Sequence, residues 1–78
     1  MPRSTSSPDW VVTRRQQIGD QIRAARVHAN LTQQQVAERI EMDRAKYNRI
    51  EQGHASALLD TLILIAAAIG VPLADLVR

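Results

Sequence analysis

The stretch from Thr32 to Gly53 constrains the fold more than any other part of the chain, because start and stop signals of helices recur within it at short spacing. Thr32 lies three residues before Gln35, which is the spacing of a capping box at a helix N-terminus. Asp43 follows as a second N-cap residue, and Gly53 is the residue type that most often ends a helix. The stretch therefore predicts two short helices, one after each cap, joined by a tight turn.

The segments on either side also have helical patterns. Apolar residues spaced three, four or seven apart predict an amphipathic helix over about residues 8–28, and the apolar segment 58–69 predicts a helix of the core. We therefore expect an all-α fold, a compact bundle of about five helices. It should form one domain at residues 8–78, after a disordered tail at residues 1–7 that is rich in Ser and Pro. Exposed faces of the first helix should carry Arg14, Arg15, Arg23 and Arg26.

Composition excludes several classes of protein. The 78 residues have no Cys and only two isolated His, so the sequence indicates no disulfide, no metal site and no cofactor. No paired acidic residues at catalytic spacing, nucleophile with a base, or Gly-rich phosphate loop is present, which argues against an enzyme. No apolar run is long enough to span a membrane. We expect a cytoplasmic protein, and its net charge of +2 permits nucleic acid as a partner.

The second helix of the central stretch has the side chains of a DNA-reading helix. If Tyr47 and Ile50 point inward, helical spacing turns a short basic ridge outward. Arg recognises guanine, Asn recognises adenine, and Ala can contact the methyl group of thymine. The ridge therefore predicts contacts to the bases of double-stranded DNA from Arg44, Ala45, Lys46, Asn48 and Arg49.

Phosphate contacts are expected beside this ridge. Gln33 and Gln34 stand at a helix start, where unpaired backbone N–H groups and the positive end of the helix dipole favour an anion. Such contacts would fix the register of the protein on DNA. The expected phosphate-binding residues are Thr32, Gln33, Gln34, Asp43 and His54.

Three segments together resemble the XRE family, the helix-turn-helix domain of phage repressors and Cro proteins. They are LTQQQVAERI, MDRAKYNRIEQG and LLDTLILIAAAIGVPLADLV, and the resemblance covers most of the chain. It implies five helices, of which the third enters the major groove, usually in a dimer on a palindromic operator. It also implies base reading by the ridge, a phosphate contact from Gln33 and an ion pair between Arg26 and Glu51.

Two residues depart from the pattern of the family. Glu41 occupies a turn position that is commonly Gly, so either the turn is strained by about 1–2 kcal/mol or its geometry differs. Tyr47 replaces an aliphatic residue, and its hydroxyl must then reach solvent, a protein acceptor or a DNA phosphate.

The helix over residues 58–69 carries more apolar residues than one face needs. Its inward set is expected to be Leu59, Leu62, Ile65, Ala66 and Ile69. The remaining apolar face, where a monomer would place charges, predicts a subunit interface. The residues expected there are Leu58, Thr61, Leu64, Ala67 and Ala68.

These features predict a sequence-specific, DNA-binding transcriptional regulator that acts as a homodimer. A restriction-modification controller and a small phage-like repressor both fit. The alternative from another class is an antitoxin-type module that binds a protein partner through its apolar surface and binds DNA secondarily.

Overall fold

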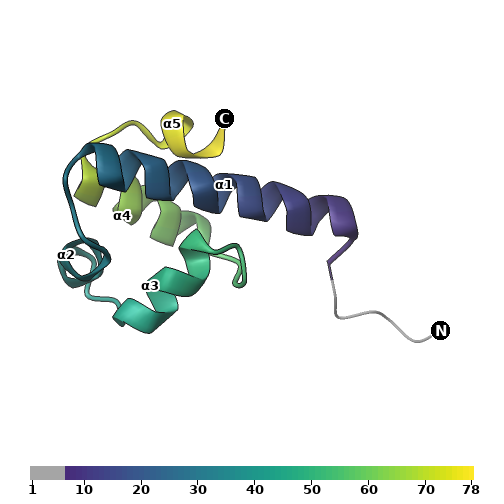
Figure 1. The fold of residues 1–78 in the computed structure, drawn as a ribbon, viewed down its shortest axis with the longest axis horizontal. Coiled ribbons are helices and arrows are strands. Elements are labelled where there is room, and N and C mark those ends of the chain that lie inside the picture. Colours follow the sequence, from purple (N-terminus) through teal and green to yellow (C-terminus); the bar gives the residue numbers. More distant parts are fainter. Residues whose placement is uncertain (1–6) are drawn as a thin grey trace.

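The structure is a computed structural model that describes residues 7–78, and within that range it contains five helices and no strand. The helices are α1 (Asp9–His28), α2 (Gln33–Arg39), α3 (Arg44–Glu51), α4 (Leu59–Ile69) and α5 (Leu73–Val77). In Figure 1, α1 runs along the molecule with α5 on one side and α3 on the other, and its N-terminal end projects beyond the rest. The prediction of an all-α bundle is confirmed. Most of the tail expected at residues 1–7 lies outside the described residues.

Both predicted caps form. The Thr32 hydroxyl accepts a hydrogen bond from the Gln35 backbone N–H at 3.1 Å, and the Gln35 side chain accepts one from the Thr32 N–H at 2.8 Å. The Asp43 carboxylate accepts a hydrogen bond from the Lys46 N–H at 3.2 Å. These bonds satisfy backbone N–H groups that a helix start leaves unpaired, and they set the first residues of α2 and α3.

One hydrogen-bond motif ends α1, α2 and α3. After α2, the Glu41 N–H donates to the carbonyl of Glu38 at 3.2 Å and the Met42 N–H to the carbonyl of Ala37 at 2.9 Å. This pair of bonds is a Schellman motif, which needs one residue in the left-handed region. That residue is Asn30 after α1, Glu41 after α2 and Gly53 after α3, with φ of 61°, 55° and 73°. The turn before α3 thus keeps the left-handed geometry although it has no glycine.

Replacing Glu41 with Gly should stabilise the protein. A side chain in the left-handed region costs about 1–2 kcal/mol, whereas Gly loses roughly 0.5–1 kcal/mol through the extra freedom of the unfolded chain. We expect the free energy of unfolding to rise by about 0.5–1 kcal/mol in urea denaturation. Glu38→Gly, at an exposed position within α2, is the matched control and should lower it by about 1 kcal/mol. An equal loss in both variants would contradict strain at Glu41.

The core is apolar and draws on every helix. Its fully or nearly buried members are Ile22, Val36, Ala37, Tyr47, Ile50, Ile65, Ala66, Ile69 and Leu76. The prediction that Leu59 points inward is wrong, because this side chain is 63% exposed. Leu59 is the first residue of α4, where the helix extends past the core, and Leu62 one turn later packs there instead. Ile63, which was assigned to neither face, is also exposed.

The first helix is less freely solvated than its sequence suggests. Arg14 Nη2 donates to the carbonyls of Val77 and Arg78 at 2.7 and 2.6 Å, and Arg15 Nε donates to the carbonyl of Gly53 at 2.8 Å. Both side chains are half-buried, and so is Arg26, so the prediction that these three lie on exposed faces is wrong, whereas Arg23 is exposed as expected. The partners of Arg14 and Arg15 are backbone carbonyls far along the chain, at the end of α5 and just after α3.

Candidate nucleic-acid interface

The second and third helices pack against each other through small and apolar side chains, and one side of α3 remains exposed to solvent. Ala37 of α2 is 1% exposed, and Tyr47 and Ile50 of α3 are buried against the core. The turn between the helices is only four residues long, from Ile40 to Asp43. The inward set predicted for α3 is thus the buried set, and the opposite side of the helix faces solvent.

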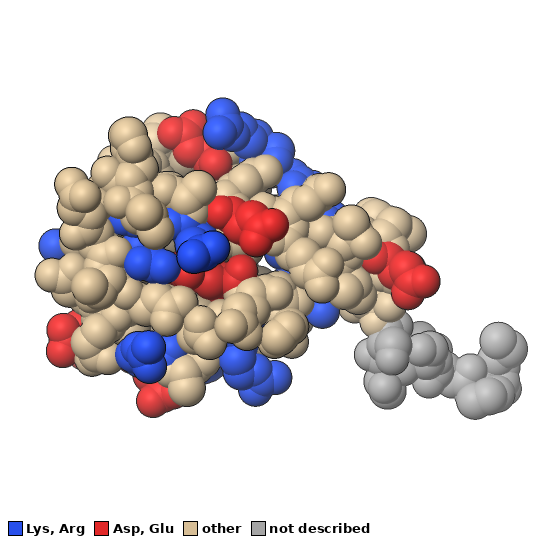
Figure 2. Space-filling model, in the orientation of Figure 1, with Lys and Arg blue, Asp and Glu red and all other residues tan. Residues whose placement is uncertain are grey.

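The outward side of α3 is a basic ridge. Four of its members are exposed and Asn48 is half-buried: Arg44, Ala45, Lys46, Asn48 and Arg49. Lys and Arg atoms lie along the lower edge of the molecule in Figure 2, where Figure 1 places α3. A helix that presents cations, an amide and a small apolar group together can form the donor, acceptor and methyl contacts of the major groove.

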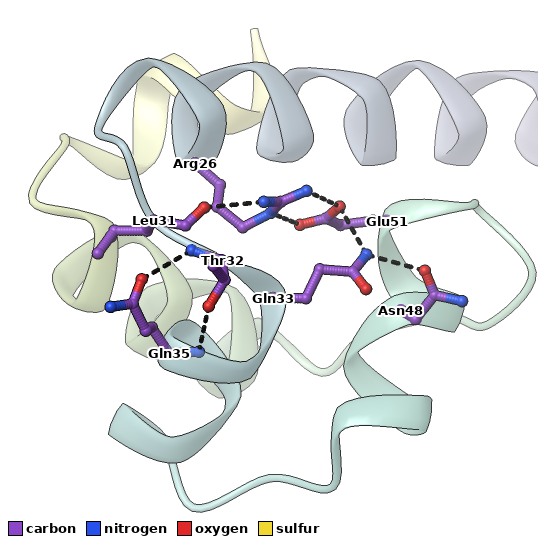
Figure 3. A network of polar contacts seen from close by, with 7 residues as sticks. All are labelled: Arg26, Leu31, Thr32, Gln33, Gln35, Asn48 and Glu51. Carbon is purple, nitrogen blue, oxygen red and sulfur yellow. Dashed lines mark hydrogen bonds and ion pairs between the residues drawn. The ribbon is translucent and has the colours of Figure 1, made fainter.

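An ion pair joins α1 to the end of α3. Arg26 Nε lies 2.6 Å from Glu51 Oε2, and Arg26 Nη2 lies 3.1 Å from Glu51 Oε1 (Figure 3). The side chains are only 11% and 2% exposed. Gly19 allows α1 to come this close, because a Cβ there would overlap the backbone carbonyl of Glu51. The pair is bidentate and shielded from water, which is the geometry in which an Arg–carboxylate interaction is strongest.

The environment of Glu51 favours its charged form. Burial would raise the pKa of its carboxyl group, but the hydrogen bonds from Arg26, the nearby hydroxyl of Tyr47 and the hydrogen bond from Gln33 outweigh burial and leave the pKa below its ordinary value. The hydrogen bond to Glu51 likewise raises the pKa of Arg26. Both groups therefore stay ionised throughout the neutral range, and the link between α1 and α3 persists there.

Gln33 extends this network to the reading ridge. Its Nε2 donates to Glu51 Oε1 at 3.1 Å and to Asn48 Oδ1 at 2.8 Å, as Figure 3 shows. A carboxylate can only accept, so Glu51 fixes the Gln33 amide with its nitrogen inward. Asn48 must then turn its oxygen toward Gln33. The Nδ2 group of Asn48 is left as the outward donor.

Tyr47 fills the space behind this network. Its ring is fully buried, and its hydroxyl has no partner with hydrogen-bond geometry among the described residues. Burial raises the pKa of Tyr47, and the nearby carboxylate of Glu51 raises it further. Of the three destinations expected for the hydroxyl, burial excludes solvent, and the group lies close to the carboxylate of Glu51 but without a well-formed bond.

The helix-turn-helix family profile matches residues 22–76, which include the ridge, the network and α4. The chain belongs to the XRE family of helix-turn-helix DNA-binding proteins. None of the curated proteins matches it significantly in sequence.

Two solved structures share the XRE-type fold. The restriction-modification controller protein C.AhdI from Aeromonas hydrophila superposes with a TM-score of 0.75 at 23% identity, over 78% of this chain and 92% of that one. The clp gene regulator ClgR from C. glutamicum gives a TM-score of 0.78 at 22% identity, over 81% of this chain and 82% of that one. At these identities the likeness establishes the fold alone.

The residues expected to bind phosphate in this XRE domain have different environments. The side chains of Thr32 and Asp43 are used as helix caps. Gln34 and His54 are exposed, on either side of the network. Both hydrogens of the Gln33 amide are already donated within the protein, so this side chain can contact a phosphate only by releasing one of them. No sequence pattern predicts the hydrogen bond between Gln33 and Asn48, because it depends on how α2 and α3 pack.

The residues expected at a subunit interface lie along the outer part of α4. Leu58 and Leu64 are 77% and 51% exposed, Ala67 is exposed, and Thr61 and Ala68 are half-buried. The carbonyl of Ala68 also accepts a hydrogen bond from Arg39 at 2.7 Å, which ties α2 to α4. With Leu59 and Ile63 added, the exposed apolar surface is wider than the sequence indicated.

Two kinds of site are absent from the described part of the chain. Residues 7–78 contain no group of three or more His, Asp or Glu side chains that could hold a metal ion. No helix in the same range is both long enough and apolar enough to cross a membrane.

Glu51→Gln should destabilise the fold strongly at neutral pH. It removes the charge but keeps the shape, so Arg26 is left buried without a counter-charge, and we expect a loss of about 3–5 kcal/mol in the free energy of unfolding. Urea denaturation measures it. Glu38→Gln, at an exposed position on α2, is the control and should change little.

The same variant gives a pH test. Since the pKa of Glu51 is lower in the folded state, its stabilising contribution is complete above the unfolded pKa, about 4.3, and is lost as the pH falls through the folded pKa. The difference in stability between the wild type and Glu51→Gln should therefore shrink in acid. A difference that stays constant down to pH 2 would contradict the role assigned to this carboxylate.

Proposed function

We propose that this protein is a sequence-specific transcriptional regulator that binds a palindromic operator as a homodimer, with α3 in the major groove. The observation that carries the proposal is the outward ridge of α3, which is held to α1 and α2 by the buried Arg26–Glu51–Gln33 network. A reading helix must present its side chains in a fixed register, and a rigid support provides that register.

Each residue of the ridge has a chemical role in this proposal. Arg44 and Arg49, which are exposed, would read guanine by donating to O6 and N7. Ala45 would contact the methyl group of a thymine, and Lys46 would donate to a guanine or a nearby phosphate. These contacts discriminate between bases because every base pair shows a different pattern in the major groove.

Asn48 reads differently from a free asparagine. A free side chain can both accept from N6 and donate to N7 of adenine. Here Asn48 Oδ1 already accepts from Gln33, and the outward Nδ2 can only donate. The position should therefore prefer bases whose hydrogen-bonding groups in the major groove are all acceptors, which are guanine and thymine. The adenine contact proposed from the residue type alone becomes the weaker option.

Phosphate contacts would come from the edges of the ridge. Exposed Gln34 at the start of α2 and His54 after α3 can donate to backbone phosphates, as can the backbone N–H groups near Thr32 and Gln33. Asp43 would contribute through its cap on α3 rather than through a direct contact, because its carboxylate repels a phosphate.

The homodimer is supported by the outer surface of α4. Leu58, Leu59, Ile63 and Leu64 are all more than 45% exposed, and contiguous apolar surface of this kind marks an interaction site. A two-fold dimer would present two copies of α3 to two half-sites about one helical turn of DNA apart. This geometry favours a palindromic operator.

The same surface keeps a second candidate open. An antitoxin-type module would use the apolar residues of α4 to bind a different protein. Among regulators, a restriction-modification controller and a small phage-like repressor both fit a domain of this fold.

Selection from random DNA tests the proposal. The purified protein should enrich a palindrome of two equal half-sites. Arg44→Ala and Arg49→Ala should each weaken binding to it by about 1–3 kcal/mol and relax preference at one position per half-site. Failure to enrich any symmetric motif would contradict the proposed homodimeric regulator.

Gln33→Ala tests the orientation of Asn48. Without Gln33, the Asn48 amide can turn over, so preference at the base it reads should shift toward adenine or be lost. Gln34→Ala is the matched control, since Gln34 is its exposed neighbour and would weaken binding to all sequences evenly. Repeating the selection with both variants measures the effect. An unchanged preference in Gln33→Ala would show that Gln33 does not position Asn48.

A further inference from the structure

An apolar groove lies beside the first half of α1. Its volume is about 360 Å³, and it runs between the first half of α1, the loop after α3 and the first turn of α4. Its apolar lining includes Trp10, Val11, Ile18, Ala57 and Leu62. Arg14 and Arg15 contribute the charged groups. The groove takes no part in the proposed reading of DNA.

Part of the groove lies outside the family profile. The family profile begins at Ile22, so the segment of α1 from Asp9 to Gln21 lies before it. This segment forms the projecting end of α1 in Figure 1 and carries Trp10, which is 73% exposed. A large aromatic ring left in water at the rim of an apolar groove indicates a surface that is covered in the working protein.

An exposed apolar segment directly follows a residue of the groove lining in the sequence. Leu58 and Leu59 follow Ala57 of the groove lining and are 77% and 63% exposed. Asp60 comes next and is the only charged residue of α4. A groove and an exposed segment on one surface can form an isologous contact, in which the segment of each copy binds in the groove of the other.

We propose that the groove of one copy receives Leu58–Asp60 of a second copy, and that Trp10 closes over the contact. This inference rests on the proposed homodimer and specifies its arrangement. The two-fold axis then passes near the first turn of α4, and the projecting end of α1 becomes part of the interface.

The area of α4 supports this wider contact. An exposed apolar patch such as the outer face of α4 typically measures about 300–600 Å² of accessible surface. A stable interface buries about 800 Å² on each partner. Trp10 alone can add about 150–250 Å², and the groove walls add more. The α4 face on its own is too small for a stable dimer, whereas the face together with the groove approaches the required size.

The charges at the groove also favour Leu58–Asp60 of a second copy as its occupant. Arg15 uses only its Nε for the carbonyl of Gly53, and Arg14 uses Nη2 for carbonyls at the end of the chain. A guanidinium has five N–H donors, so each keeps donors for an incoming anion. In the proposed contact, Leu58 and Leu59 of one copy would lie in the apolar part of the partner's groove, and Asp60 would lie near the two arginines of that groove. The same contacts would form in the opposite direction.

Disulfide cross-linking between two single-cysteine chains tests the arrangement, since the chain has no Cys of its own. We mix chains carrying Val11→Cys with chains carrying Leu59→Cys, and oxidise them at a concentration where sedimentation shows dimers. Val11 lines the groove, so at least tenfold more cross-linked product is expected than with Thr13→Cys, an exposed position on the other side of α1. A disulfide needs Cα atoms about 4.4–6.8 Å apart, which makes the comparison selective.

Trp10 provides a second measurement because it is the only tryptophan. Its emission should shift to the blue as the wild type is concentrated into dimers and return to the red on dilution. Leu59→Glu, at an exposed position that the fold does not need, should abolish both the dimer and the shift while leaving the helical circular dichroism unchanged.

The outcomes separate this inference from the proposed homodimer. A wild type that sediments as a monomer at every concentration contradicts both and leaves the apolar surface to a different protein. A wild type that dimerises while Val11→Cys links no better than Thr13→Cys, or while Trp10 emission stays constant, overturns the groove contact alone.

Discussion

The buried pair between Arg26 and Glu51 is the interaction on which the arrangement of the other elements depends. It joins two helices that are far apart in sequence, and a buried carboxylate is tolerated only where its oxygens are hydrogen-bonded. Arg26 supplies two bonds and Gln33 a third, so three helices converge on one side chain. The requirement to satisfy Glu51 therefore sets how α1, α2 and α3 meet.

The same hydrogen bonds also orient a side chain on the proposed DNA-reading surface. Gln33 faces Glu51 with its nitrogen because the carboxylate offers only acceptors, and Asn48 responds by turning its oxygen inward. The arrangement leaves the hydroxyl of Tyr47 buried near Glu51 without a well-formed hydrogen bond. Burial of a hydroxyl without a well-formed bond is unfavourable, whereas the packing of the ring in the core favours the same position.

Sequence reasoning succeeded where the signal is local and failed where partners are distant. Thr32 and Asp43 cap helices through bonds three residues away, so their spacing was sufficient. The Schellman motifs at Asn30 and Glu41 are harder to predict from the sequence, because a residue other than glycine gives little indication of a positive φ. Leu59 was misplaced because α4 is apolar on nearly every side, and periodicity then cannot decide which residues face the core. The link from Gln33 to Asn48 depends on how two helices pack, which spacing along the chain does not reveal.

The end of α3 is held from two directions by one helix. Arg26 of α1 binds the carboxylate of Glu51, and Arg15, three turns earlier on the same helix, binds the carbonyl of Gly53. The first contact supports the reading ridge and the second adjoins the apolar groove. Because α1 is a continuous helix through both points, the ridge and the groove cannot move independently. In a dimer joined at the groove, the separation of the two α3 helices would then be set by α1, and the half-site spacing of about 34 Å that a major-groove reader needs would not depend on a flexible loop.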